Sequence, residues 1–128
     1  MTKIPTIKIG DTLIATVHED LTDRDALEFQ EALNARLERE GATGLLIDVA
    51  LVNMIDSFLG RLLHEIAQGA RLLGASTVVA GIQPAVAITL VELGLQLPGV
   101  RTALTTERGL LLLAQDVARE KKANIVGQ

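Results

Sequence analysis

One serine stands where a buried strand gives way to an amphipathic helix, a place where a hydroxyl can do chemistry. Ser57 lies between Asp56 and Phe58, just ahead of an apolar stripe at helical spacing. The start of a helix carries unpaired backbone N–H groups and a partial positive charge. A serine there can cap the helix through its hydroxyl, or it can accept a phosphoryl group that the helix end tolerates. The sequence leaves both interpretations open.

The two interpretations have different consequences. As a cap, Ser57 would contribute roughly 1 kcal/mol to stability. As a phosphorylation site, it would gain a charge of about −1.5 to −2 beside Asp56 and Phe58, which changes the surface and not the fold. A nucleophilic serine needs a base, and the sequence places neither His18 nor His64 to act as one. The Gly-x-Ser-x-Gly motif is also absent.

Two other groups of residues could carry chemistry. Asp48 and Asp56 form an acid pair that suggests hydrolysis or metal binding, but hydrogen bonding and turn formation at strand ends explain them more simply. The turn that contains Gly81 and Gln83 could cradle an anion at a helix start, although it lacks the spacing of a P-loop. No metal site is predicted, because the helix around His64 has no second ligand one turn away.

Composition excludes several classes of function. A net charge of −4 and the absence of Trp and Tyr disfavour nucleic acid as a partner. With no cysteines, disulfides and thiolate sites are excluded, and no cofactor is predicted. The stretch 72–91 is uncharged, but Gly, Ser, Gln and Pro interrupt it, so we expect no membrane span and a cytoplasmic location. The 48% apolar content predicts that other subunits cover part of the surface.

The elements that must position Ser57 follow from periodicity. Strands are expected over 4–9 and 13–17, joined by a hairpin at Gly10-Asp11, and then over 45–49, 77–80 and 100–104. A helix capped by Thr22 or Asp23 ends at Gly41, and the helix after Ser57 ends at Gly74. A third helix starts at Pro84 and runs to about 93–94. A fourth starts after Thr105 or Thr106 and ends near 121–122, with 124–128 frayed.

This order predicts a single α/β domain over 1–128. Strands alternating with helices imply a mostly parallel sheet with an antiparallel edge hairpin, packed against about four helices. In such sheets, functional groups gather where strands end and helices begin, which is where Ser57 and Gln83 both lie. The run of four leucines at 110–113 is either a deeply packed helix or a subunit contact.

The segments around Ser57 resemble a known family. Leu45-Leu46-Ile47-Asp48-Val49 followed by Met54-Ile55-Asp56-Ser57-Phe58 is similar to the phosphorylatable segment of STAS domains, the anti-anti-sigma-factor family. The segments 26–31 and Gly81-Ile82-Gln83-Pro84-Ala85 narrow the resemblance to the scaffold proteins of the bacterial stressosome, the RsbS type. The resemblance covers nearly the whole chain.

The resemblance implies a non-enzymatic scaffold that acts by partner switching. Such a scaffold co-assembles with a paralogous STAS sensor of the RsbR type into a large particle and sequesters a serine-protein kinase of the RsbT type. The kinase phosphorylates the scaffold, here at Ser57, and leaves, and a phosphatase of the RsbX type resets the system. Asp56 and Phe58 would shape the acceptor surface. The paralogous sensors carry a second phosphorylated residue near their first helix, which makes Thr22 a candidate second site unless Asp23 supplies a fixed charge there.

Two rival functions stay open on the sequence alone. The first is a simple anti-anti-sigma factor that binds an anti-sigma kinase one-to-one, with the same fold and the same serine. The second is a small-ligand or nucleotide-binding module that uses the turn at Gly81 and Gln83.

Overall fold

The chain alternates strands and helices in the predicted order. A computed structural model describes residues 4–18, 21–53, 56–92 and 100–126. The elements, in chain order, are β1 (Thr6–Ile9), β2 (Thr12–Thr16), α1 (Asp23–Glu40), β3 (Gly44–Asp48), α2 (Ser57–Leu72), β4 (Ser76–Ala80), α3 (Pro84–Glu92), β5 (Val100–Ala103) and α4 (Thr106–Val126).

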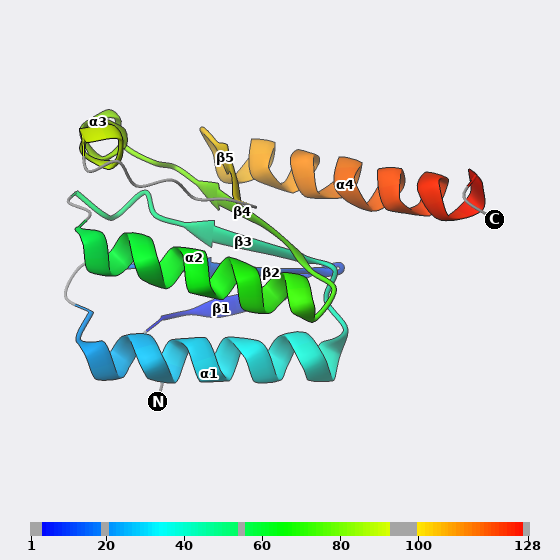
Figure 1. The fold of residues 1–128 in the computed structure, drawn as a ribbon, viewed down its shortest axis with the longest axis horizontal. Helices are drawn as coiled ribbons and strands as arrows, with labels where there is room; N and C mark the ends of the chain where they lie inside the picture. Colours follow the sequence, from blue (N-terminus) through cyan, green and yellow to red (C-terminus); the bar gives the residue numbers. More distant parts are fainter. Residues whose placement is uncertain (1–3, 19–20, 54–55, 93–99, 127–128) are drawn as a thin grey trace.

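The strands form one sheet in the order β1-β2-β3-β4-β5. β1 and β2 pair antiparallel through the hairpin at Gly10, which adopts a left-handed φ of 58°. The remaining neighbours pair in parallel. The predicted α/β class, the edge hairpin and the mostly parallel sheet are therefore confirmed. Because β2, β3 and β4 run in one direction, α1, α2 and α3 all begin at the same edge of the sheet (Figure 1).

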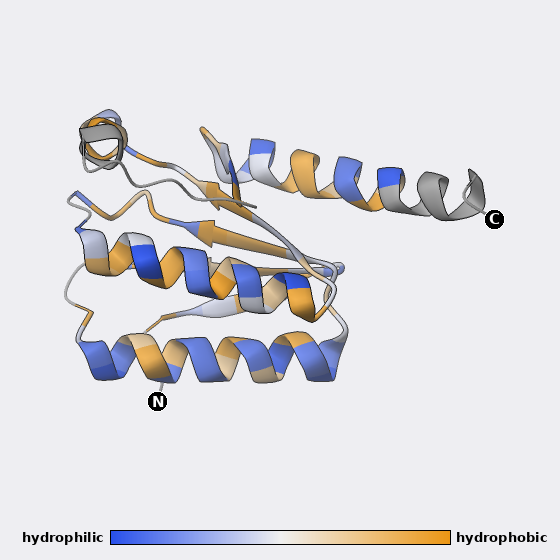
Figure 2. Cartoon of the chain, in the orientation of Figure 1, coloured by the Kyte–Doolittle hydropathy of each residue, from blue (hydrophilic) through white to orange (hydrophobic). Residues whose placement is uncertain are grey.

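Helices cover both faces of the sheet. α1 and α2 pack side by side on one face, and α4 lies on the other (Figure 1). β3 and β4 are apolar along most of their length (Figure 2), as expected for strands buried on both sides. The larger core lies under α1 and α2 and includes Phe29, Leu33, Leu45, Ile47 and Leu63. A smaller core lies under α4, around Leu46, Val78 and Leu113.

Several helix ends are where the sequence predicts them. Thr22 caps α1 in a capping box, and Gly41 closes that helix with a left-handed φ of 61°. The Thr105 hydroxyl accepts from the backbone N–H of Arg108 at 3.2 Å, so Thr105 is the cap of α4. Gly74, with a φ of 86°, follows the end of α2. These positions are predictable because each depends on local backbone chemistry alone.

Other boundaries differ from the predictions. β1 begins at Thr6 and not at residue 4, because Pro5 has no backbone N–H to donate to the ladder, although its carbonyl still accepts from the N–H of Thr16. α4 extends to Val126, so the frayed end predicted over 124–128 is wrong for its first residues. The predicted end of α3 at 93–94 lies outside the described residues.

The run of leucines on α4 is divided between core and surface. Leu113 is buried, whereas Leu111 is 63% exposed. Leu110 and Leu112 are partly buried against the smaller core. Neither interpretation of the run therefore accounts for all four residues. Among the residues that the structure describes, no helix is long and apolar enough to cross a bilayer.

Candidate functional site

Ser57 lies on the surface as the first residue of α2. The helix begins there because Asp56 keeps an extended backbone, with φ −109° and ψ 178°, and its carboxylate accepts from the backbone N–H of Leu59 at 2.9 Å. Asp56 is thus the helix cap, and the capping interpretation of Ser57 is wrong. Both residue types cap helices well, and only the backbone conformation decides between them.

This assignment leaves the Ser57 hydroxyl without a capping role. The hydroxyl sits beside the positive end of the α2 dipole, and no acidic residue occupies the first turn of the helix. The Asp56 carboxylate is the nearest acidic group along the chain, but it is engaged by the N–H of Leu59. The site can therefore accept a negatively charged group on Ser57 without the loss of a hydrogen bond that holds the helix start.

Two exposed apolar side chains lie close to Ser57 along the chain. Phe58 is 37% exposed, and Leu51, in the loop that leads to Ser57, is 54% exposed. Leu59, one residue further on, turns into the core. The acceptor surface that the sequence predicts, which we define as Asp56, Ser57 and Phe58, combines a hydroxyl, a carboxylate and a partly exposed ring.

A neighbouring turn holds the loop before Ser57. The Gln83 side-chain amide donates to the backbone carbonyl of Ala50 at 2.8 Å and to Oδ1 of Asn53 at 3.0 Å. Gly81 approaches the same loop so closely that a Cβ on it would lie 3.0 Å from the Cβ of Ala50. Gly81 and Gln83, predicted as a candidate anion-binding turn, thus tie the start of α3 to the loop after β3.

Asp48 has the structural role that the sequence favoured. Its Oδ1 accepts from the backbone N–H of Ala50 at 2.9 Å, closing a turn directly after β3. The same oxygen would lie 3.2 Å from a Cβ built on Gly81. A carboxylate so close to this turn opposes the binding of an anion there. Among the described residues, no group of three or more His, Asp or Glu side chains could hold a metal ion.

Thr22 lies at the same edge of the sheet as Ser57, since α1 and α2 begin side by side (Figure 1). Its hydroxyl accepts from the backbone N–H of Asp25 at 3.1 Å, and the Asp25 carboxylate accepts from the N–H of Thr22 at 3.2 Å. Thr22 is exposed. The Thr22 hydroxyl holds the cap of α1, whereas the Ser57 hydroxyl holds no cap. Phosphorylation of Thr22 would therefore disturb the start of its helix, and phosphorylation of Ser57 would leave the cap of α2 intact.

Comparison with known proteins supports the family resemblance. The model of the family described as STAS domain matches residues 3–107. Among curated proteins, the chain is similar to "RsbT co-antagonist protein RsbRA" of Bacillus subtilis, with 30% identity over 89 residues. That match covers 70% of this chain and 32% of the relative. A second relative in the same organism, "RsbT co-antagonist protein RsbRC", is 36% identical over 62 residues, which are 48% of this chain and 22% of the relative. The chain thus spans about a third or less of the length of these relatives.

Solved structures agree along nearly the whole chain. A serine-to-glutamate variant of Moorella thermoacetica RsbS superposes with a TM-score of 0.78 at 39% identity, covering 91% of this chain and 98% of that one. A chain from the structure named "Molecular architecture of the stressosome, a signal integration and transduction hub" gives a TM-score of 0.77 at 41% identity, covering 90% and 99%. The anti-sigma factor antagonist SpoIIAA, at 14% identity and a TM-score of 0.66, shares the fold.

Proposed function

Because the chain belongs to the STAS domain family, we propose that it is a non-catalytic scaffold and antagonist of the stressosome type. In this proposal it co-assembles with a paralogous STAS sensor of the RsbR type into a large particle. The assembly sequesters a serine kinase of the RsbT type and releases it when Ser57 is phosphorylated, and a phosphatase of the RsbX type reverses the modification. The pathway regulated is a stress response.

Similarity along the full length supports the scaffold part of the proposal. The two solved relatives of about 40% identity cover nine tenths of this chain and nearly all of their own. Co-antagonist proteins named for RsbT match the same domain at 30% to 36% identity. A domain that resembles both the scaffold and the sensor chains is suited to pack against either one.

One observation carries the switch part of the proposal: the exposed Ser57 hydroxyl is not used to hold the helix. Asp56 caps α2 by itself, so phosphorylation costs no structural hydrogen bond. The phosphate would gain roughly 0.3–1 kcal/mol from the helix dipole, opposed by the Asp56 charge. The fold therefore persists, and a partner that needs the ring of Phe58 meets a dianion beside it.

The first test is the intact mass of the protein after incubation with ATP and an RsbT-type kinase. We expect wild type to gain one phosphoryl group and Ser57→Ala to gain none. Ser76→Ala is the matched control, because Ser57 and Ser76 are the two serines of the chain. A phosphoryl group on Ser57→Ala that maps to Thr22 would establish the second site. Unmodified wild type with an active kinase would refute the switch.

The second test is the size of the particle formed with the paralogue, measured by light scattering after size-exclusion chromatography. The scaffold proposal predicts a large assembly that retains the kinase, and it predicts that Ser57→Glu weakens kinase retention more than Ser57→Gln does. Small species under all conditions, with one kinase bound per chain, would indicate the one-to-one anti-anti-sigma factor instead.

A further inference from the structure

A cavity lies at the edge of the sheet opposite to Ser57. It has a volume of about 650 Å³ and sits between the end of α2, the first residues of β4 and β5, and the middle of α4. Small-molecule sites in proteins commonly enclose about 300–1,000 Å³. Its lining includes three arginines, Arg71, Arg101 and Arg119, together with Asp116 and Thr77. None of these residues belongs to the acceptor surface around Ser57.

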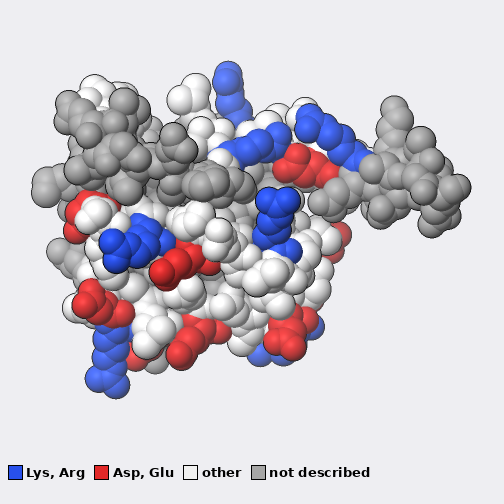
Figure 3. Space-filling view, viewed as in Figure 1, with Lys and Arg blue, Asp and Glu red and all other residues white. Residues whose placement is uncertain are grey.

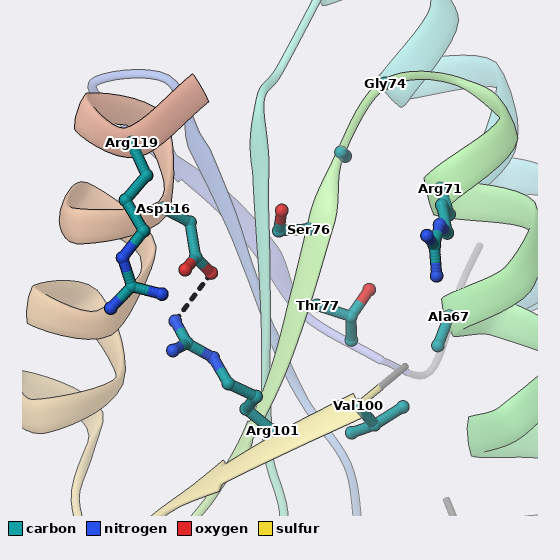
Figure 4. A pocket seen from close by; sticks show the side chains of 10 residues that line it. Ala67, Arg71, Gly74, Ser76, Thr77, Val100, Arg101, Asp116 and Arg119 are labelled. Atoms are coloured by element: carbon teal, nitrogen blue, oxygen red, sulfur yellow. Dashed lines mark ion pairs between the residues drawn. The ribbon is translucent and has the colours of Figure 1, made fainter. Parts of the chain in front are cut away.

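The arginines come from three different elements and lie on opposite walls. Arg71 is on α2, whereas Arg101 on β5 and Arg119 on α4 lie across the cavity, with Thr77 on the strand between them (Figure 4). The lining carries three guanidinium groups and one carboxylate, with Arg71 on the α2 side of β4 and Arg101, Arg119 and Asp116 on the α4 side, so it has an excess of positive charge in a chain whose net charge is −4. Figure 3 shows blue side chains gathered around a red one in the region between α2 and α4.

Arg101 is held in place by the protein itself. Its Nη2 donates to Oδ2 of Asp116 at 2.6 Å and to the backbone carbonyl of Leu112 at 3.0 Å. These contacts hold the Arg101 guanidinium against α4 in the lining of the cavity. Arg71 and Arg119 form no side-chain hydrogen bond or ion pair with the residues that the structure describes. Arg71 alone could be explained as a cation that complements the C-terminus of α2, but that account does not cover the other two.

Thr77 supplies an independent observation. It is 4% exposed, lines the same cavity, and its hydroxyl oxygen is buried with no hydrogen-bond partner among the described residues. Buried hydroxyls are normally paired, because an unpaired one loses its hydrogen bonds to water without replacement. A polar group retained at the wall of a positively charged cavity points to a ligand that carries oxygen acceptors.

We propose that this cavity binds the phosphoryl group of a small molecule. Guanidinium groups recognise phosphate oxygens through paired N–H donors, which Arg71 supplies on one side of β4 and Arg119 on the other. Thr77 lies on the same side of β4 as Arg71, so its hydroxyl would donate to one further oxygen of a group bound by Arg71. Apolar lining from Ala67, Ala75 and Val100 contacts the body of the molecule. The site is distinct from the turn at Gly81 and Gln83, and it does not depend on Ser57 being a phosphorylation site.

The test is isothermal titration calorimetry of the full chain with inorganic phosphate, pyrophosphate and ATP, and with adenosine as the uncharged control. We expect binding of at least one phosphate compound and none of adenosine. Comparable affinity for pyrophosphate and ATP would place recognition in the phosphates, and tighter binding of ATP would add contacts to the body of the ligand.

Substitutions inside and outside the cavity distinguish a specific binding site from nonspecific electrostatic attraction of anions. Arg71→Gln and Arg119→Gln are each expected to weaken binding about tenfold. Arg61→Gln, which removes an exposed arginine of α2 outside the cavity, should leave binding unchanged. Thr77→Val is expected to weaken binding severalfold while the free protein stays as stable as wild type, because it replaces an unpaired hydroxyl by a methyl group of the same shape. Thr77→Ser should retain affinity.

Two results would overturn the proposal. One is the absence of binding by any phosphate compound at millimolar concentration, which would leave the arginines as contacts for another protein or for the fold alone. The other is an equal loss of affinity in Arg61→Gln and Arg71→Gln, which would show diffuse electrostatic attraction in place of a site.

Discussion

Asp56 and Leu59 form the hydrogen bond that starts α2, with the Asp56 carboxylate 2.9 Å from the backbone nitrogen of Leu59. Because of this bond, the residue that caps the helix is not the residue whose hydroxyl is a candidate for modification. Asp56 holds the helix, and Ser57 next to it stays on the surface with its hydroxyl uncommitted to the cap. A protein that is modified at a helix start can therefore keep the helix intact in both states.

The cap assignment predicts opposite outcomes for two adjacent alanine substitutions. Asp56→Ala should lower the free energy of unfolding by about 1 kcal/mol, because it removes the cap. Ser57→Ala should change it by less than about 0.5 kcal/mol, as for an exposed residue without a structural contact. Urea denaturation of the two variants measures both values. A larger loss in Ser57→Ala than in Asp56→Ala would show that the serine caps the helix after all.

Because α4 packs closely against the sheet at Gly109, we expect any larger residue at this position to destabilise the protein. A Cβ on Gly109 would lie 2.6 Å from Cδ1 of Leu46, inside the smaller core. Gly109→Ala gains roughly 1 kcal/mol of helix propensity, but we expect overpacking of about 1–3 kcal/mol to outweigh it. Gly69→Ala on α2 is the matched control, since its nearest neighbour is the movable amide of Asn34 at 3.3 Å. Thermal melts should show a lowered Tm only for Gly109→Ala.

The link between Gln83 and the loop before Ser57 can be tested by its removal. Gln83→Leu deletes the hydrogen bonds to Ala50 and Asn53, and we expect a loss of about 1–2 kcal/mol. Hydrogen exchange should show lower protection in residues 49–53 and little change in α1. Gln68→Ala, at an exposed position of α2, serves as the control. Unchanged exchange in the loop of Gln83→Leu would mean that other contacts hold it.

The contact between Arg36 and Glu40 predicts a dependence of stability on pH. The Arg36 guanidinium donates to the Glu40 carboxylate at 2.7 Å and holds the pKa of that carboxyl below its ordinary value of 4.5. A lowered pKa in the folded state gives a stabilising contribution that is present above pH 4.5 and is lost as the pH falls through the lowered pKa. The difference in unfolding free energy between wild type and Glu40→Gln should therefore shrink on acidification past pH 4.5.

The control for this prediction is Glu31→Gln, which changes an exposed glutamate of the same helix. Its difference from wild type should vary less with pH. If the difference between wild type and Glu40→Gln stays constant through the acid range, the contact with Arg36 makes no contribution that depends on ionisation. Arg36 also donates to the backbone carbonyl of Thr6 at 2.8 Å, which ties α1 to β1 and is unaffected by Glu40→Gln.

Most of the fold could be predicted from local patterns. The apolar runs of β3 and β4 and the helical stripes of α1 and α2 indicated a mostly parallel sheet with helices between the strands. The hairpin at Gly10 and the caps at Thr22 and Thr105 follow from the chemistry of a few adjacent residues. The extension of α4 to Val126 was not predicted, because the pair Lys121-Lys122 is typical of the basic last turn of a helix, and positive charge favours a helix C-terminus without ending the helix.

The sequence by itself determined that Ser57 lies where a buried strand passes into a helix, because strand and helix periodicity are properties of neighbouring residues. Only the tertiary structure decided that Asp56 is the cap and that Gln83 braces the loop before the serine. It also brought Arg71, Arg101 and Arg119 to one cavity. The physical reason is that periodicity specifies which face of an element is apolar, whereas contacts between polar side chains depend on how α2, β5 and α4 pack around the sheet.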